Sequence, residues 1–371
     1  MALKLPSNRR VFEVGIICAL PIEAYYVKAI FSEIDDEDNW SDKNDARGRR
    51  AVGNRNAYTT GKVGRHDVVL VHMPSIGKVS AAGVAASLTY SFEGLRLVIL
   101  AGISSGSPLG TKENEIVLGD IVLGKTVIQY DLGRQYPDGF KRKSNPDESL
   151  GRQNPEIRAF VNKLEAGKDE LEESTFECLM ALTDKLGHQK IQYPGVLEDK
   201  LFESDYDHKH QIGDDCEERL CSKGNQICQI SQQSSCEQVK CSDQYLVPRH
   251  RLSKIGDAAQ AGRDAQATKP IIHFGAIASG DKVMKSARDR DMITEKEGVI
   301  AFEMEGAGVW EYLPCIIVKG VCDYADSHKN KIWQGYAAAA AAACTEAILK
   351  KWPKADRQYQ EDQASFIFTQ F

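Results

Sequence analysis

Two adjoining stretches decide the fold: SIGKVSAAGVAASLTYSF at residues 75–92 and RLVILAGIS at residues 96–104. The first is rich in small residues and begins with a glycine turn, which predicts a helix. The second is a continuous apolar run, which is typical of a strand buried on both faces. A buried strand that directly follows a helix favours an α/β fold with a parallel or mixed sheet.

The same alternation continues on both sides of this pair. Residues 11–20 predict a buried strand and residues 21–34 a helix that begins with proline. Residues 57–73 predict a hairpin with its turn at residues 64–67. Further strands and helices are predicted within residues 119–131, 269–284, 298–310, 315–326 and 333–352. These elements together predict a single α/β domain.

The chain changes character in its middle. Residues 141–268 are charged and cysteine-rich, and they contain few long apolar runs. We therefore predict one domain built from residues 1–140 and 269–352, interrupted by an insertion at residues 141–268. Residues 353–371 form a polar tail ending in FIFTQF, which predicts a docked strand or a disordered end.

Composition limits the classes of function. The chain has 371 residues, and its 42% hydrophobic content is sufficient for a large core. Its 53 acidic and 47 basic residues give a net charge of −6, which argues against a general nucleic-acid binder. The first residues lack the pattern of a signal peptide, and the apolar runs are too short to span a membrane. We expect a cytoplasmic protein with no membrane partner.

One phosphate-binding motif appears in the sequence and is not expected to function. GDIVLGKT at residues 119–126 matches the P-loop pattern G-x-x-x-x-G-K-[ST]. A working P-loop is a glycine-rich turn between a strand and a helix. Here the intervening residues are apolar and the run continues as a strand, so the match is interpreted as accidental.

Five of the ten cysteines crowd into the predicted insertion, just after His208 and His210; they are Cys216, Cys221, Cys228, Cys236 and Cys241. The C-x₄-C spacing at 216/221 and at 236/241 is compatible with a structural zinc knuckle. Disulfides and reduced thiols fit the same spacing. The sequence leaves these three alternatives open.

Carboxylates and small polar residues follow several of the predicted strands. Glu23 follows the first strand, Ser104 and Ser105 stand at the end of the strand that begins at residue 96, and Asp323 and Asp326 follow the strand at 315–321. Ligands in open α/β sheets bind at the carboxyl ends of strands, although such acids are often only turn or cap residues. Several converging carboxylates suit acid–base chemistry on a glycosidic bond.

The segment FEMEG adds Glu303 and Glu305 inside an apolar run. Carboxylates are costly to bury without partners, so this pair predicts either a solvated face or a polar ligand. In a regular strand residues 303 and 305 would share one face and Met304 the other, and a bulge or a strand end is expected there.

Seven motifs in order resemble the nucleoside phosphorylase/nucleosidase superfamily, which includes purine nucleoside phosphorylases and methylthioadenosine/S-adenosylhomocysteine nucleosidases. They are VGIICALPIEA, SIGKVSAAG, VILAGISSG, GDIVL, IASGD, FEMEGAG and VCDYAD. Longer segments such as YPGVLEDKLFESDYDHKH resemble fungal purine-nucleoside-phosphorylase-like domains. The resemblance implies a three-layer α/β/α fold with a mixed, partly closed sheet that binds a purine nucleoside.

The resemblance also implies roles for individual residues. Asp323 would protonate or hydrogen-bond N7 of the leaving purine, Glu23 would activate water, and Glu305 would hold the ribose hydroxyls. The substrate pocket would further include Met304, Glu303, Gly102, Ile103, Ser104, Ser279, Asp281 and Gly77. No catalytic metal or cofactor is expected, and relatives of this kind imply a homo-oligomer.

Departures from the family pattern favour hydrolysis over phosphorolysis. CALPIEA contains no arginine and Leu100 stands at a second arginine position, so a phosphate nucleophile lacks its expected clamp. Ile103 and Val283 replace the serine and the stacking phenylalanine of the bacterial nucleosidases. The first expectation is therefore hydrolysis of a purine nucleoside or of a nucleotide such as ATP. A phosphorylase and a non-catalytic purine-binding module are the alternatives.

Basic residues in or near the insertion offer a site for the 5′ side of the ribose, and a solvated surface of mixed charge is the alternative. They are Arg134, Lys141, Arg142, Lys143, His208, Lys209, His210, Arg249, His250 and Arg251.

Overall fold

The computed structural model describes residues 9–34, 56–108, 115–211, 221, 227–260 and 268–354. The predicted tail beyond residue 354 and Cys216 lie outside these residues. The strands are β1 Val14–Cys18, β2 Glu33–Ile34, β3 Ala57–Val63, β4 His66–His72, β5 Leu97–Gly106, β6 Ile121–Gln129, β7 Gly133–Tyr136, β8 Gly139–Arg142, β9 Ile272–Ser279, β10 Val299–Glu303 and β11 Cys315–Asp323. The helices are α1 Pro21–Ala29, α2 Lys78–Ser91, α3 Pro155–Ala166, α4 Lys168–Leu186, α5 Gln229–Gln233, α6 His250–Gln260, α8 Ala287–Glu297, α9 Gly306–Val309 and α10 Gln334–Lys351.

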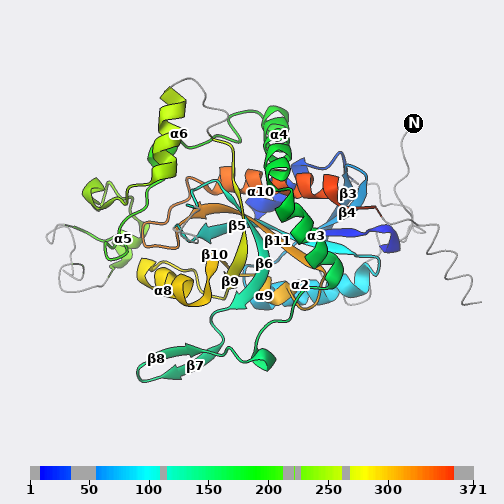
Figure 1. Ribbon diagram of the computed structural model, residues 1–371, viewed down its shortest axis with the longest axis horizontal. Helices are drawn as coiled ribbons and strands as arrows, with labels where there is room; N and C mark the ends of the chain where they lie inside the picture. Colours follow the sequence, from blue (N-terminus) through cyan, green and yellow to red (C-terminus); the bar gives the residue numbers. More distant parts are fainter. Residues whose placement is uncertain are drawn as a thin grey trace, which may run out of the picture.

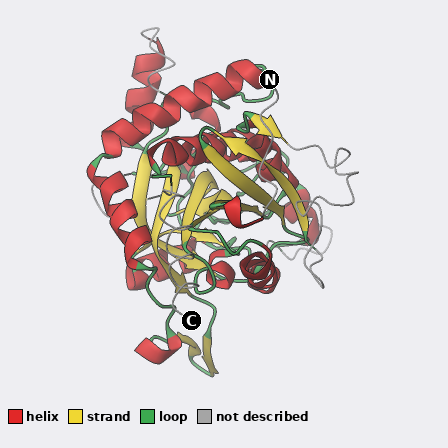
Figure 2. Cartoon of the chain, turned by 90° about the vertical axis from the view of Figure 1, so that its right-hand side faces the viewer, coloured by secondary structure: helices red, strands yellow, loops and turns green. Residues whose placement is uncertain are grey.

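A mixed sheet of nine strands forms the centre of the molecule, in the order β10-β9-β6-β11-β5-β1-β4-β3-β2. Helices α10 and α1 pack on one face, and α2, α8 and α9 lie on the other (Figure 1). Figure 2 shows the sheet enclosed between these helices. The predicted three-layer α/β/α architecture with a mixed sheet is confirmed.

One end of the sheet curls back on itself. β10 is parallel to β9 and also pairs antiparallel with the end of β5, through Ala301 with Gly106 and Phe302 with Ser105. Strands β5, β11, β6, β9 and β10 therefore form a closed ring, while β1, β4, β3 and β2 continue as an open sheet. The ring brings the end of β10 beside the end of β5, although the two strands run in opposite directions.

Most local predictions are confirmed, and one helix end is wrong. The predicted helix at 75–92 is α2, the predicted strand at 96–104 is β5, and GDIVLGKT forms part of β6 rather than a P-loop. The helix predicted over 21–34 ends at Ala29, because Glu33 and Ile34 pair with Lys62 and Gly61 of β3. This pairing is a contact with a distant segment, which helical periodicity does not register.

The predicted insertion contributes to the main core. Helix α4 packs against α10, α3 contacts α4 and β11, and the apolar faces of both helices join the same buried cluster as the central strands. The ring of Phe160 meets Trp352 edge to face with centroids 4.7 Å apart. By contrast, the small hairpin β7–β8 projects from the body of the molecule (Figure 1). None of the described helices has the length and apolar character needed to cross a bilayer.

Candidate functional site

Three parallel neighbours, β11, β5 and β1, end at the same edge of the sheet. Their ends bring together Glu23, Ser104 and Asp323, and the ring closure adds the end of β10. A cavity of about 200 Å³ lies at this place. Its lining comprises Ala19, Leu20, Glu23, Ile76, Ile103, Ser104, Ser105, Lys282, Val283, Met284, Phe302, Glu303, Met304, Glu305, Cys322, Asp323, Lys329 and Gln334.

Glu23, in the first turn of α1, is held in place by main-chain donors. The backbone N–H groups of Ala19 and Leu20 donate to Oε2 at 2.9 and 2.8 Å, and that of Ile103 donates to Oε1 at 2.8 Å. Gly102 makes room for this carboxylate, because a Cβ at that position would lie 2.2 Å from Oε1. Burial raises the pKa of the Glu23 carboxyl, although nearby Lys319 acts to lower it.

Glu303 and Glu305 do not lie in one regular strand. β10 ends at Glu303, and Glu305 is the cap of the short helix α9, so the strand end expected near Met304 is confirmed. The carboxylate of Glu303 turns back and accepts hydrogen bonds from the N–H groups of Glu305 and Gly306 at 3.0 and 2.8 Å. Glu303 therefore stabilises the turn that presents Met304 and Glu305 to the cavity.

Lys319 is a site residue that the sequence reasoning missed. Lys319 lies in β11 and is 0% exposed to solvent. Its Nζ is 3.2 Å from Glu305 Oε2 and 3.7 Å from Glu303 Oε2. Burial acts to lower the pKa of Lys319, but the carboxylates of Glu305, Glu23 and Glu303 raise it, and the net change is upward. The available signal was a single lysine in the otherwise apolar run CIIVKGVC.

Asp323 closes β11 and has a cationic neighbour. Its Oδ1 accepts from the N–H of Ala325 at 3.0 Å, and its Oδ2 lies 2.9 Å from Lys329 Nζ. Lys329 also donates to the hydroxyl of Ser105 at 3.3 Å. Burial acts to lower the pKa of Lys329, but Asp323, Cys322 and Asp326 together act to raise it, and the net change is upward. This arrangement couples an acid and an ammonium group at the inner end of the cavity.

A second cavity of about 600 Å³ adjoins the first, and Cys322, Asp323 and Lys329 line both. Its wall includes Phe202, Tyr324, Asp326 and His328. Asp326 Oδ2 and both ring nitrogens of His328 are buried and have no hydrogen-bond partner among the described residues. Burial raises the pKa of Asp326 to about 6 and lowers that of His328 to about 3. Buried polar atoms normally have partners, so these atoms are suited to a bound ligand or to water.

The other predicted pocket residues have different positions. Gly77 and Asp281 line a neighbouring hollow with Met304; Gly77 N–H donates to Glu305 Oε1 at 3.3 Å, and Lys78 N–H donates to Asp281 Oδ1 at 2.8 Å. Ser279 is fully buried and does not line either cavity. Its hydroxyl accepts a hydrogen bond from the N–H of Ala307 at 2.9 Å. It therefore holds the turn after Glu305.

None of the basic residues proposed for the 5′ side, all of which the structure describes, lines the first cavity. Arg249 donates to the carbonyl of Ile116, and Arg251 pairs with Asp120. Arg142 forms a bidentate ion pair with Glu297, in which Nε donates to Oε1 at 2.9 Å and Nη2 donates to Oε2 at 2.6 Å. The prediction is wrong for these three arginines, which anchor loops. His208 lines the second cavity, and the cations along the first cavity, among the described residues, are Lys282 and Lys329.

The sequence of this chain matches known proteins. The sequence pattern of the Phosphorylase superfamily matches residues 13–177. A nucleotide-binding leucine-rich repeat (NLR)-like protein of Hyaloscypha variabilis is 29% identical over 91% of this chain, which spans only 29% of that protein. A 5′-methylthioadenosine/S-adenosylhomocysteine nucleosidase of Mycobacterium bovis is 21% identical over 92% of this chain and 96% of its own length.

Solved structures share the fold. The nucleosidase of the same name from Helicobacter pylori superposes with a TM-score of 0.51 at 14% identity, covering 92% of this chain and 99% of that one. The futalosine hydrolase of Helicobacter pylori gives 0.50 at 14% identity, covering 93% and 100%. The matched sequence pattern, the curated relatives and the shared fold make this chain similar to the nucleoside phosphorylase/nucleosidase superfamily.

Proposed function

We propose that the protein is an N-ribosyl hydrolase that releases the base from a purine nucleoside or nucleotide. The observation that carries this proposal is the arrangement of Glu23, Glu305 and Asp323 around one cavity. These carboxylates are attached to different elements and have different partners, so they are suited to different tasks. The relatives named nucleosidases support hydrolysis of a glycosidic bond.

Glu305 is the residue proposed to hold the sugar. Its two oxygens accept from Gly77 N–H and Lys319, and a carboxylate has further lone pairs for the 2′- and 3′-hydroxyls of ribose. Met304 packs on the sugar, and the Ser104 hydroxyl, which is buried without a partner among the described residues, offers another polar contact. Lys319 neutralises the charge of the buried glutamates behind the sugar.

Glu23 is proposed to take a proton from the attacking water, which bonds to C1′ while the bond from C1′ to the base nitrogen breaks. The electron pair passes to the purine, and Asp323 protonates or hydrogen-bonds N7. Lys329 adds positive charge beside the departing base. We assign the base to the second cavity, next to Asp326 and His328, because Asp323 lies at the boundary of both cavities.

Phosphorolysis is less well supported. Inorganic phosphate is usually held by bidentate arginines, and no arginine lines either of the two described cavities. A phosphorylase would need Lys282 and Lys329 to hold the anion as point charges. Incubation with adenosine, inosine, guanosine and ATP, with and without phosphate, separates the two reactions. Base release that does not depend on phosphate is expected, and strict phosphate dependence would identify a phosphorylase.

The same assay tests whether the protein is a catalyst. Glu23→Gln keeps the size of the side chain and removes its basicity, while Glu177→Gln changes an exposed glutamate of α4, outside both cavities, as a matched control. We expect Glu23→Gln to abolish measurable turnover and Glu177→Gln to retain it. No release of base by the unmodified protein from any of the four substrates would favour the binding module.

The pH dependence of the rate gives a further prediction. Glu23 must be ionised to accept a proton, and burial raises its pKa above the ordinary value of 4.5. The rate should therefore fall with decreasing pH, with an apparent pKa above 4.5, when kcat is measured across pH 4–8. An apparent pKa at or below the ordinary value would contradict the role of Glu23.

A further inference from the structure

Two groups of histidine and cysteine side chains come from residues between positions 208 and 241. The first histidine–cysteine group is His208, Cys236 and Cys241, and the second is His210, Cys221 and Cys228. Within each group, one ligand atom from every residue lies within 4.8 Å of the others. Cys216, which the C-x₄-C spacing paired with Cys221, lies outside the described residues.

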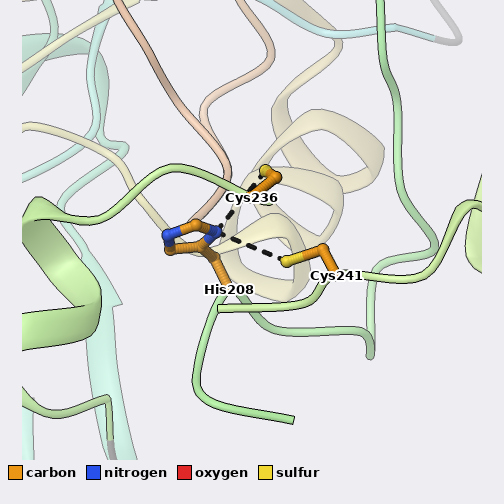
Figure 3. A group of neighbouring side chains, drawn as sticks. All are labelled: His208, Cys236 and Cys241. Carbon is orange, nitrogen blue, oxygen red and sulfur yellow. Dashed lines mark hydrogen bonds between the residues drawn. The ribbon is translucent and has the colours of Figure 1, made fainter. Parts of the chain in front are cut away.

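The distances in both groups match the edges of a zinc tetrahedron. His208 Nδ1 is 3.6 Å from Cys236 Sγ and 3.5 Å from Cys241 Sγ (Figure 3). His210 Nδ1 is 3.7 Å from Cys221 Sγ and 3.4 Å from Cys228 Sγ. Zinc bonded to nitrogen at ~2.05 Å and to sulfur at ~2.3 Å, with tetrahedral angles, separates the two ligand atoms by about 3.6 Å.

The tautomer of His208 is set for metal binding. Its Nε2 lies 3.0 Å from the carbonyl oxygens of Ser231 and of Ser234, so Nε2 carries the hydrogen and donates it. Nδ1 therefore presents a lone pair, and Figure 3 shows both thiols directed toward it. A histidine whose second nitrogen donates to a main-chain carbonyl is the usual arrangement for a metal ligand.

The cysteines are also positioned by the main chain. Cys241 N–H donates to the carbonyl of Cys236 at 2.8 Å, and Lys240 adopts a left-handed conformation with φ 61° to complete this turn. In the second group, the N–H of Ser231 donates to Cys228 Sγ at 3.4 Å, which favours the thiolate that a metal binds. Ser231 therefore links the groups, because its carbonyl accepts from His208 and its N–H donates to Cys228.

We propose that each group binds one Zn²⁺ ion, and that the two ions hold the described residues 208–211, 221 and 227–241 against the loop that follows β11. Two thiolates and a neutral imidazole cancel the charge of Zn²⁺, so the complex can be buried at little electrostatic cost. Disulfides between the paired cysteines would not require a histidine nitrogen close to both sulfurs. Sulfur and imidazole ligands select zinc over the harder divalent cations.

The first ion lies behind the proposed catalytic loop. The N–H of His208 donates to the Ser327 hydroxyl at 2.8 Å, and the His208 ring meets the ring of His328 edge to face with centroids 5.5 Å apart. His328 in turn stacks on Phe202 at 3.9 Å. His208 and Cys236 also line the second cavity. The metal-bound segment therefore forms one wall of that cavity.

Metal analysis of the full chain, purified with reductant and dialysed against metal-free buffer, tests the proposal. We expect about two zinc ions per chain, and about one in Cys241→Ser or Cys228→Ser, since each variant removes a ligand from one group. The matched controls are Cys178→Ser and His188→Ala, which lie outside both groups and should keep both ions. Absence of bound zinc, or stoichiometric binding of another metal instead, would overturn it.

A second measurement uses the unaltered chain, so that the result does not depend on whether a variant folds. Zinc removed by a chelator is replaced by Co²⁺, and the intense near-ultraviolet absorption of thiolate-to-cobalt charge transfer is followed by titration. We expect saturation at about two equivalents, with alkylation of these cysteines blocked in the loaded protein. Disulfides 221–228 or 236–241 found by mass spectrometry of the freshly purified chain would contradict the proposal.

Discussion

Lys319 is the residue on which the charge balance of the candidate site depends. It lies between Glu303 and Glu305, and replacing it by methionine leaves these buried carboxylates without their cation. We expect Lys319→Met to lower the free energy of unfolding at pH 7.5 by about 3–5 kcal/mol, the usual cost of breaking a buried pair. Chemical denaturation measures the change. The control is Lys141→Met, which removes an exposed ion pair with Asp138 and should change the free energy of unfolding by less than about 0.5 kcal/mol.

The sign of the pH effect follows from the direction of the pKa shifts. Burial already raises the pKa of Glu303 and of Glu23, and removal of Lys319 raises them further. A raised folded-state pKa gives stability that is full below the unfolded value of 4.5 and is lost as the pH rises. The defect of Lys319→Met should therefore shrink between pH 7.5 and pH 4.5. An equal defect at both pH values would mean that packing, not charge, explains the loss.

Asp323 allows a test of the proposed chemistry at a single residue. Asp323→Asn keeps the shape of the side chain but removes its negative charge and its ability to deliver a proton. We expect the rate of base release to fall by ~10²–10⁴. Loss of the ion pair with Lys329 should also lower the unfolding midpoint, so the rate is measured at a temperature at which circular dichroism shows the variant to be folded. Asp243→Asn alters an exposed aspartate and should leave the rate unchanged. Near-normal turnover in Asp323→Asn would show that another group assists the leaving base.

For single residues, the sequence indicated the positions of the acidic site residues better than those of the lysines and arginines. Glu23, Ser104 and Asp323 follow apolar strands, and that local pattern alone indicates a shared edge of the sheet. Lys319 lies inside a strand, and only the three-dimensional placement of Glu303 and Glu305 explains its charge. Arg249 and Arg251 stand beside histidines in the sequence, yet each is occupied by a partner more than 100 residues away.

The element that shapes the core is α10, the alanine-rich helix that lies on β5 and β11. Its small side chains let the backbone approach the sheet so closely that a Cβ on Gly320 would lie 2.0 Å from the carbonyl oxygen of Ala337. We expect Gly320→Ala to lower the unfolding free energy by ~1–3 kcal/mol through overpacking. Thermal denaturation measures this change.

Gly83 supplies a control with the opposite sign. It lies in α2 with no atom within 4 Å of an added Cβ, so Gly83→Ala should stabilise the protein by up to about 1 kcal/mol through helix propensity. Destabilisation by both changes to a similar extent would argue against close packing at Gly320 as the cause.

Elements are predictable where their signal is local. The apolar run of β5 and the small-residue repeat of α2 are visible in the sequence, as is the alanine run of α10. The two residues of β2 are not, since they become a strand only by pairing with β3. Ring closure through β10 and β5 is equally invisible to periodicity, because it is set by register between strands about 200 residues apart.

The whole molecule behaves as one core although its sequence changes character in the middle. Leu179 of α4 is 3% exposed and belongs to the buried cluster that includes the central strands. We expect Leu179→Ala to lower the unfolding free energy by about 2–5 kcal/mol and to shift one cooperative transition as a whole. Met180→Ala, at the neighbouring 37% exposed residue, should cost much less. Unfolding of α4 in a separate transition would show an independent domain.

Composition misses this relationship because α3 and α4 carry many charges on their outer faces. Their buried positions, such as Leu171 and Leu179, are single apolar residues spaced along amphipathic helices, and an average over the segment hides them. The site is therefore more predictable than the arrangement of α3 and α4.

Ring closure also decides how this sheet can meet another chain. A nine-stranded sheet normally presents two rows of unpaired main-chain groups that invite strand addition. Here β10 uses one of those rows to pair with β5, and at the other edge of the described sheet the two residues of β2 pair with only part of β3. Ring closure thus reduces the template for intermolecular β-addition at the β10 edge, and strand addition to the described fold is left to the β2–β3 edge and to the projecting hairpin β7–β8.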